Sequence, residues 1–380
     1  MNNYYTLPRI NNIIKINPNI NCNDITPYIS QTLIHYYNEL AKEVNILCAK
    51  KNGDITNELN NEMNNYDEII KLVNPYEYIF SKVPGSNYSV SKLKLKSMMF
   101  YDLLEIFQTM NILESYTYDI MNSLIVGVNY EDSLECLEML RENYINDKFF
   151  CFCEYTSKQH NCIEKNKFNF IIYELNNYNN VNHYIILLIE LILIILNNLN
   201  DGGNVIIKLN NIFFKPVIEI LYLLSCLFEK VSIIKPNTSN ITNFDKYIIL
   251  QKFKLNINNF EAKNNYTMVF KDFILKYDDN NVKNDEKYNL NIHSISNIEL
   301  PYYFLNKIDD INIIIGQQQL ESLNKIINLL KSKNKDNNLE LLKKNNIQKC
   351  VNWCEKYKIP CNKFSDRINI FLPLEKATDV

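Results

Sequence analysis

The segment that most constrains the fold begins at the Gly-Gly pair Gly202-Gly203. It continues as the apolar run Asn204–Leu209, which ends close to a lysine, Lys208, and then as a helical stretch and a second apolar run. A Lys-Pro-x-x-Ser sequence, Lys235–Ser239, separates that run from a third one that starts at Tyr247. This order predicts strand, helix, strand, loop and strand. The last two strands are close in sequence, so we expect them to be antiparallel.

Strands and helices also alternate upstream of this segment, from Ser91 onwards. Such alternation over about 170 residues predicts an α/β fold with a doubly wound, mostly parallel sheet. The predicted helices are Ser91–Met110, Asp132–Asn143 and His183–Leu199, and the predicted strands are Tyr118–Val128, Lys148–Tyr155 and Phe168–Leu175.

The chain divides into three predicted regions. Residues 1–80 show helical periodicity, clearest over Ile29–Cys48, and form a helical N-terminal region. Residues 81–255 hold the α/β domain. Residues 256–380 are mostly helical and follow an Asn/Lys/Asp-rich linker at Asp278–Lys287. The apolar run Tyr184–Leu196 is too short to cross a bilayer and contains a glutamate, so we expect a buried core helix.

Composition restricts the class of protein more than its fold. The formal net charge is only −3, so a nucleic-acid surface must be a local patch. Asn, Ile, Lys and Tyr dominate while arginine occurs only at three positions, a bias towards A/T-rich codons that points to an A/T-rich organism or a large DNA virus. The 10 cysteines and the lack of a signal peptide indicate reduced thiols and a protein that is not secreted, in the cytoplasm of a host or in a virion.

The Gly-Gly strand, its lysine, the Lys-Pro-x-x-Ser loop and the closing strand together resemble the FtsJ-like RNA ribose 2'-O-methyltransferases, in particular the larger members encoded by nucleocytoplasmic large DNA viruses. The resemblance covers roughly Ser91–Phe253. It implies a Rossmann-like methyltransferase fold with flanking helical regions, S-adenosylmethionine as cofactor, and RNA, often the mRNA cap, as substrate. It also implies a Lys-Asp-Lys-Glu tetrad, whose central lysine orients or deprotonates the ribose hydroxyl.

Three of the four tetrad positions keep the sign of their charge. The central lysine falls on Lys208, although a lysine at a strand end also occurs as a mere snorkelling side chain. The glutamate of the family's Ser-x-Glu-x-Tyr segment falls on Asp245, and the aspartate at the end of the fourth strand falls on Glu174. We expect Lys208, Glu174 and Asp245 to lie close together, because two acids compensate a partly buried lysine.

The first lysine of the tetrad is replaced by Asp102, which reverses a charge. We expect Asp102 on the rim of the cluster, where a third negative charge keeps Lys208 protonated and unfit as a base. Lys92, Lys94 and Lys96 precede it and either contact RNA phosphates or form a solvated face. Two further candidates for RNA contact come from the Lys-Pro-x-x-Ser loop, Lys235 and Ser239.

The cofactor loop differs most from the family. The family's first strand ends in a Pro-Gly-Gly turn, where bare backbone lets the cofactor approach. Here one glycine remains, Gly127, and it follows the β-branched Ile125 and Val126. Gly127 and Glu174 are therefore the cofactor-binding candidates, and we expect affinity for S-adenosylmethionine to be low or absent.

No metal site is expected. Cys151, Cys153, His160 and Cys162 are clustered, but their spacing matches no closed zinc pattern. Walker, G-x-S-x-G, H-E-x-x-H and GxGxxG motifs are absent from the sequence.

Three functions remain open at this point. The first, which we prefer, is a catalytically degenerate methyltransferase homologue that serves as a structural or regulatory subunit of RNA-processing machinery. The second is an active enzyme with an atypical tetrad. The third is an unrelated viral scaffold or virion protein on the same fold. A pocket near Gly127, Glu174 and Lys208 would be open in an active enzyme and filled by side chains in a degenerate one.

Overall fold

The computed structural model describes residues 4–11, 14–53, 69–117, 119–154, 166–175, 180–254, 257–283, 290–331 and 336–362. They fall into two compact units. The first unit combines Met1–Glu43 with Met99–Asn324, and the second combines Val44–Met98 with Lys325–Val380. Each unit is thus built from two stretches that are distant in sequence.

The first unit contains a seven-stranded sheet of order β1-β7-β8-β6-β5-β3-β4. β4, β3, β5 and β6 are parallel, while β8 is antiparallel to both of its neighbours, β6 and β7. This is the predicted α/β sheet with antiparallel closing strands. The strands are β1 (Tyr4–Thr6), β3 (Asn122–Val126), β4 (Lys148–Phe152), β5 (Phe168–Glu174), β6 (Leu199–Leu209), β7 (Phe228–Ile234) and β8 (Lys246–Phe253).

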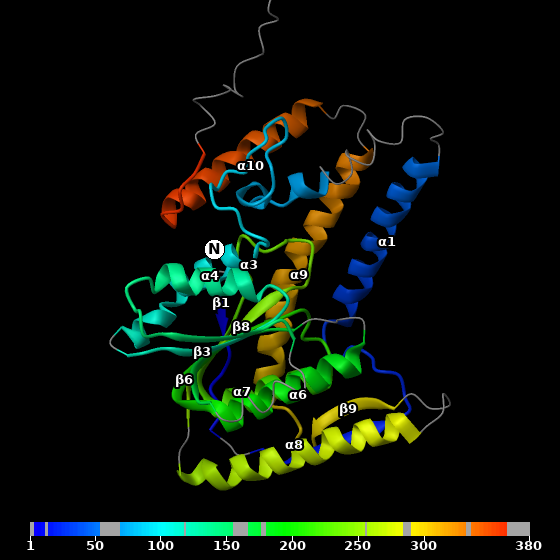
Figure 1. The fold of residues 1–380 in the computed structure, drawn as a ribbon. Helices are drawn as coiled ribbons and strands as arrows, with labels where there is room; N and C mark the ends of the chain where they lie inside the picture. Colours follow the sequence, from blue (N-terminus) through cyan, green and yellow to red (C-terminus); the bar gives the residue numbers. More distant parts are fainter. Residues whose placement is uncertain are drawn as a thin grey trace, which may run out of the picture. The chain divides into compact units, whose positions relative to one another are not determined.

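Helices cover both faces of this sheet (Figure 1). α3 (Met99–Met110) and α4 (Tyr130–Leu140) lie on one face, and α6 (Val181–Asn198) and α7 (Lys215–Leu227) lie on the other. α6 is long and apolar enough to cross a membrane, but its side chains form much of the hydrophobic core. It is the predicted core helix, apolar on nearly all sides because it lies between the sheet and α8 (Ile257–Lys283).

The N-terminal residues differ from the expected helical region. β1 pairs with β7 at the edge of the sheet, with Tyr5 opposite Ile233. β2 (Ile16–Asn21) pairs with β9 (Asn291–Ser296) in a separate two-stranded sheet. Strands this short carry no usable periodicity, and only their partners, more than 200 residues away, specify them.

Long helices and short 3-10 turns complete the described chain. The predicted linker is wrong over residues 278–283, because α8 continues to Lys283, while 284–289 lie outside the described residues. Of the expected helical N-terminal region, residues 69–73 are helical, while residues 54–68 lie outside the described chain. The remaining elements are α1 (Gln31–Gly53), η1 (Glu77–Ile79), η2 (Ile112–Tyr116), α9 (Tyr302–Lys331) and α10 (Asp336–Lys356).

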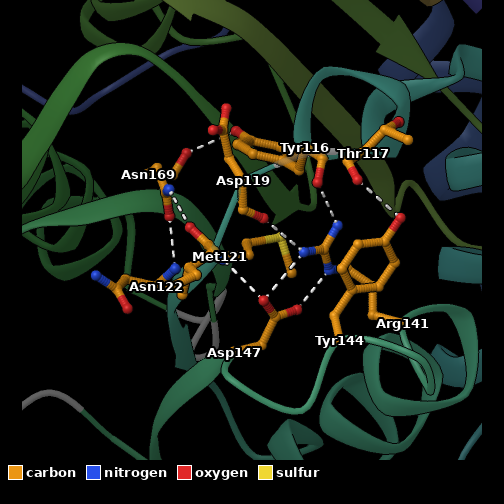
Figure 2. Close-up of polar contacts among 10 residues, drawn as sticks. Tyr116, Thr117, Asp119, Met121, Asn122, Arg141, Tyr144, Asp147 and Asn169 are labelled. Atoms are coloured by element: carbon orange, nitrogen blue, oxygen red, sulfur yellow. Dashed lines mark hydrogen bonds and ion pairs between the residues drawn. The ribbon is translucent and has the colours of Figure 1, made fainter.

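A buried arginine fixes the amino-terminal end of β3 (Figure 2). Arg141 pairs with Asp147 and also donates to the carbonyl oxygens of Tyr116 and Asp119, at 2.8 and 3.0 Å. Asp147 in turn accepts the backbone N–H of Met121 at 2.8 Å. The planar guanidinium can satisfy several acceptors at once, so one side chain ties α4, the turn before β4 and the approach to β3 together.

Candidate functional site

The candidate site lies at the carboxyl ends of β5 and β6, where open α/β sheets bind their ligands. Glu174 and Lys208 are register partners in these neighbouring parallel strands, so both side chains emerge on the same face. The Nζ of Lys208 lies 2.9 Å from Oε1 of Glu174. The structure thus joins two of the predicted tetrad residues in a largely buried ion pair.

The two charges of this pair stabilise each other. Burial alone would raise the pKa of Glu174, but the Lys208 charge and hydrogen bonds from Lys208 and Asn129 outweigh it and lower this pKa. Burial would lower the pKa of Lys208, yet Glu174, with Asp102 and Asp245 further away, raises it. Lys208 is therefore an ammonium at neutral pH and holds no lone pair with which to accept a proton.

Asp102 is fully buried on α3, and not on the rim of the cluster as expected. Its carboxylate accepts hydrogen bonds from the hydroxyls of Thr238, at 2.5 Å, and Tyr247, at 2.9 Å. Burial raises the pKa of Asp102 to about 6, against the lowering effects of Thr238 and Lys208. At neutral pH it is still mostly ionised, so the third negative charge predicted beside Lys208 is present.

Asp245 lies further from Lys208 than Glu174 does. Its Oδ1 accepts a hydrogen bond from Asn210 at 3.1 Å, and its backbone oxygen accepts one from Lys235 at 2.9 Å. It acts on Lys208 only through its charge, which raises the lysine pKa. The shorter aspartate side chain at this position does not reach the lysine that the longer glutamate of the family's pattern would approach.

Glu174 also occupies the turn that should cradle a cofactor. Gly127 has a φ of +153°, and a Cβ built there would meet Cβ and Oε2 of Glu174 at 2.5 and 2.8 Å. The backbone N–H of Asn129 donates to Oε2 at 3.0 Å, and its side-chain amide donates to Oε1 at 2.8 Å. The space and the amide donors that bare backbone offers a ligand are thus taken by an internal carboxylate.

The described residues of this turn therefore do not fit the methionine part of S-adenosylmethionine. Ile125 and Val126 lie in β3 with buried side chains, and Gly127 is filled by Glu174. Residues 155–165 and 176–179, which follow β4 and β5, are outside the described chain.

Lys235 and Ser239, predicted to contact RNA, are buried. The Nζ of Lys235 donates to the backbone oxygens of Asn243 and Asp245 and so closes the loop between β7 and β8. Burial lowers the pKa of Lys235 to about 8, despite the raising effect of Asp245. The RNA-contact prediction is wrong for both, because the Lys-Pro-x-x-Ser sequence folds inward, with Thr238 anchored to Asp102.

A second buried lysine was missed in the sequence. Lys246 is 1% exposed, and its Nζ lies 5.6 and 5.9 Å from the ring centroids of Phe213 and Phe244. Burial and the nearby Lys235 lower its pKa to about 7. The available signal was its position next to the apolar run Tyr247–Leu250, whose residues are all buried.

The other residues that the sequence did not single out are Asn129, Thr238 and Tyr247. Asn129 binds Glu174, and the two hydroxyls bind Asp102. Their partners are 45, 136 and 145 residues away, so no local pattern marks them.

Lys92, Lys94 and Lys96 belong to the second unit and are all exposed. The helix predicted from Ser91 begins only at Met99, so these lysines are not on a helix. The strict alternation of lysine with Leu93 and Leu95, which are half-buried, was the overlooked signal for an extended chain.

The cysteine cluster is only partly described. Cys151 is half-buried on β4 and Cys153 is exposed, whereas His160 and Cys162 lie outside the described residues. In the part of the chain that is described, no three His, Cys, Asp or Glu side chains are grouped closely enough to hold a metal ion.

Comparison with known proteins agrees with this fold. Residues 97–253 match the family model of the FtsJ-like methyltransferases. A cap-specific mRNA (nucleoside-2'-O-)-methyltransferase 2 from mouse is 34% identical over 56 residues, and that of Drosophila melanogaster is 41% identical over 51 residues. These segments cover 15% and 13% of this chain and 7% of each relative.

Solved structures of methyltransferases are similar at low identity. A ribosomal RNA methyltransferase from Plasmodium falciparum is 16% identical, with a TM-score of 0.32, and the match covers 42% of this chain and 98% of the other. Human methyltransferase-like protein 13, in complex with SAH, is 11% identical, with a TM-score of 0.27, over 46% of this chain and 91% of the other. Residues 97–253 of this chain are thus similar to the FtsJ-like methyltransferase family.

Proposed function

We propose that this chain is a catalytically degenerate homologue of the FtsJ-like RNA ribose 2'-O-methyltransferases. It acts as a structural or regulatory subunit of RNA-processing machinery, with the mRNA cap or another RNA as its partner. The A/T-rich codon bias fits a large DNA virus, and with it the host cytoplasm or a virion as the place of action. The similarity to cap-specific mRNA methyltransferases supports RNA as the partner.

The observation that carries this proposal is the position of the Glu174 carboxylate. It is held by Lys208 on one side and by both amide groups of Asn129 on the other, and its Oε2 stands where any side chain at Gly127 would project. A ligand that needs this turn must first break a buried ion pair and several hydrogen bonds, which costs several kcal/mol. That cost opposes cofactor binding.

A second observation supports the loss of chemistry rather than of binding alone. The base that the tetrad needs would be Lys208, and its pKa is raised by Glu174, Asp102 and Asp245. The lysine that would lower this pKa by like charge is replaced by Asp102, which acts in the opposite direction. Lys208 thus serves as a counter-ion in this arrangement.

An active enzyme with an atypical tetrad is the second candidate. The observation that favours it is that Lys208 and Glu174 are in contact, with Asp102 and Asp245 close enough to act on Lys208 electrostatically. An acid that can be protonated near pH 6, Asp102, would give such an enzyme a pH-dependent charge balance.

Titration calorimetry of the full chain with S-adenosylmethionine separates the two. We expect no saturable binding in the micromolar range for the wild-type chain. Glu174→Asp retracts the carboxylate by one methylene from Gly127 and should increase the affinity measurably, while Asn129→Ala serves as a variant that loosens the same carboxylate without shortening it. Micromolar binding to the wild-type chain at one site would overturn the proposal.

A methyl-transfer assay on capped and uncapped RNA completes the test. Degeneracy predicts no transfer above the background without protein. If the wild-type chain methylates RNA and Lys208→Ala abolishes transfer while the near-UV circular dichroism is unchanged, the active-enzyme candidate replaces ours.

A further inference from the structure

The first unit contains a cavity beside the amino end of β7, with a volume of about 530 Å³. Its lining includes Ile112 and Asn204, which are both buried, and the side chains of Arg9, Lys230 and Lys252. We propose that this cavity, the amino-end pocket, binds a small organic diphosphate of the size of a nucleoside diphosphate. The inference goes beyond the proposed function and requires neither cofactor binding nor methyl transfer.

The amino-end pocket lies away from the site at Lys208. Asn204 and Lys208 are four residues apart in β6, which corresponds to about 13 Å along a strand. Lys208 stands at the carboxyl end of the parallel strands, whereas Lys230 is near the amino end of β7. The pocket is therefore not the cofactor site that the family resemblance implies.

Positive charge exceeds negative charge in the lining of the pocket. Three cations and two carboxylates contribute to it, namely Arg9, Lys230, Lys252, Glu114 and Glu229. Glu229 lies 3.7 Å from Lys252, so these two charges compensate each other. Among the residues that the structure describes, neither Arg9 nor Lys230 has a carboxylate partner. Two cations on different segments are thus available to a ligand with more than one negative charge.

A fourth cation increases this excess. Lys254 lies close to Arg9 and Glu229, since both act on its titration: burial and then the charge of Arg9 lower the pKa of Lys254, against the raising effect of Glu229. Neighbouring cations repel each other, and an anion that binds beside them relieves the repulsion. The local charge therefore favours an anionic ligand.

The identity of one cation indicates phosphate. Arg9 is one of only three arginines in a chain that otherwise uses lysine for its positive charges. Arg141 is consumed by its buried pair with Asp147, whereas Arg9 is exposed in the lining of the pocket. A guanidinium offers a rigid fork of donors that binds two phosphate oxygens at once, which a lysine cannot do.

The pocket is formed without a ligand. The side-chain amide of Asn204 donates to the hydroxyls of Ser115 and Tyr116, at 3.3 and 2.7 Å. Its Oδ1 accepts the backbone N–H of Lys252 at 2.8 Å, so one buried side chain joins η2, β6 and β8. Lys252 has a left-handed φ of +57°, which residues with a side chain seldom adopt and which is enriched at ligand sites. A preformed cavity loses less conformational entropy when it is filled.

The size and polarity of the pocket suit more than a bare phosphate. A volume of about 530 Å³ is within the range of small-molecule sites. Asn111 and Gln251 contribute side-chain amides to the lining, and Ile112 contributes an apolar surface. Gln251 is the register partner of Lys230, so an amide and an ammonium emerge side by side. Amides can pair with the hydroxyls and ring nitrogens of a nucleoside while the cations hold its phosphates.

Titration calorimetry of the full chain with ADP tests the pocket, with inorganic phosphate and succinate as chemical comparisons. We expect saturable binding of ADP at one site, and weaker binding of phosphate and succinate. Arg9→Gln/Lys230→Gln should weaken ADP binding by about tenfold or more, because it removes both uncompensated cations. Gln251→Trp fills the cavity without changing its charge and should weaken ADP binding as well.

The matched control removes two exposed charges of the same unit outside the pocket. Lys271→Gln/Lys276→Gln should bind ADP like the wild-type chain, and far-UV circular dichroism checks that each variant is folded. The inference is overturned if the wild-type chain shows no saturable ADP binding in the millimolar range, if the control loses as much affinity as the pocket variants, or if phosphate or succinate binds as tightly as ADP. ADP binding that both pocket variants leave unchanged would place the nucleotide elsewhere on the chain and overturn it too.

Discussion

At the amino ends of the parallel strands Arg141 pairs with Asp147, and at the carboxyl ends Lys208 pairs with Glu174. Both pairs are buried ions of opposite charge, but their surroundings differ. The guanidinium of Arg141 also donates hydrogen bonds to the backbone carbonyls of Tyr116 and Asp119. The ammonium is instead acted on by two more carboxylates, Asp102 and Asp245.

This difference distinguishes the cluster at Arg141, which is structural, from the cluster at Lys208, which has the features of a former or present functional site. Backbone acceptors carry no charge that changes with pH, and they take two of the hydrogen bonds that Arg141 donates. The cluster at Lys208 has several groups of shifted pKa, which is typical of functional sites. Arginine is rare in this chain, and its use at position 141 reflects the need for a planar fork that lysine cannot supply.

The largest effect on stability is expected at Arg141, at the amino ends of the parallel strands. Arg141→Ala leaves Asp147 without its counter-ion and two carbonyls without their donor, and should lower the free energy of unfolding by about 3 to 5 kcal/mol. Arg141→Lys should recover only part of it, because the fork is lost. Urea denaturation measures both, with the exposed Arg9→Ala as control. A loss below about 1 kcal/mol in Arg141→Ala would show that the cluster is not structural.

Lys208→Ala should cost about 2 to 3 kcal/mol, because it leaves Glu174 and Asp102 uncompensated. The cost is smaller than at Arg141, since the lysine side chain is 17% exposed and water can reach it. The double variant Lys208→Met/Glu174→Gln removes both charges and should recover most of the stability in the same urea experiment. If the double variant is no more stable than Lys208→Ala, the ion pair is not what the lysine contributes.

Lys246→Met should stabilise the fold by about 1 to 2 kcal/mol at pH 7, because it removes an ammonium from an apolar site. The pKa of Lys246 is lowered to about 7, so the unfolded chain binds the proton more tightly and wild-type stability rises between about pH 7 and the normal value of 10.5. In the variant this rise should be smaller. Thermal unfolding across that pH range shows whether the two curves converge at high pH, as expected, or stay parallel.

Asp102→Asn should give a change that depends on pH, of about 3 kcal/mol between its two limits, because each pKa unit corresponds to about 1.4 kcal/mol. Because the pKa of Asp102 is raised from 3.8 to about 6, its contribution is fully present below pH 3.8 and is lost as the pH rises through 6. The variant should therefore lose stability relative to wild type at pH 4 and regain it by pH 7. A constant difference over that interval would mean that Asp102 does not titrate near 6.

The sheet and the ion pair at its carboxyl end could be predicted from the sequence because both depend on local patterns. The Gly-Gly pair and the apolar run after it predict β6. Glu174 and Lys208 each stand at the carboxyl end of a strand, and neighbouring parallel strands such as β5 and β6 bring these ends together. Those patterns need no knowledge of distant residues.

The predictions that differ from the structure concern residues placed by long-range contacts, or a segment whose sequence period is not that of a helix. Lys235 and Ser239 are named as candidates for RNA contact from the Lys-Pro-x-x-Ser loop, but they are buried, because Asp102 on α3 holds that loop inward through Thr238. A helix is expected from Ser91 because Leu95 continues the helical spacing of Met99 and Leu103. It begins only at Met99, because the strict alternation of lysine and leucine before Met99 is the pattern of an extended chain.

The pairing of β1 with β7 has a practical meaning for anyone who handles this protein in pieces. Residues 97–253 are the part that resembles a known family. Alone they leave one edge of β7 unpaired, because Tyr4–Thr6 pair with that edge. A fragment cut to the family boundaries would present that bare strand to its neighbours, the usual starting point for edge-to-edge aggregation. Tyr4–Thr6 thus cover an edge strand of a domain whose family match begins about 90 residues later.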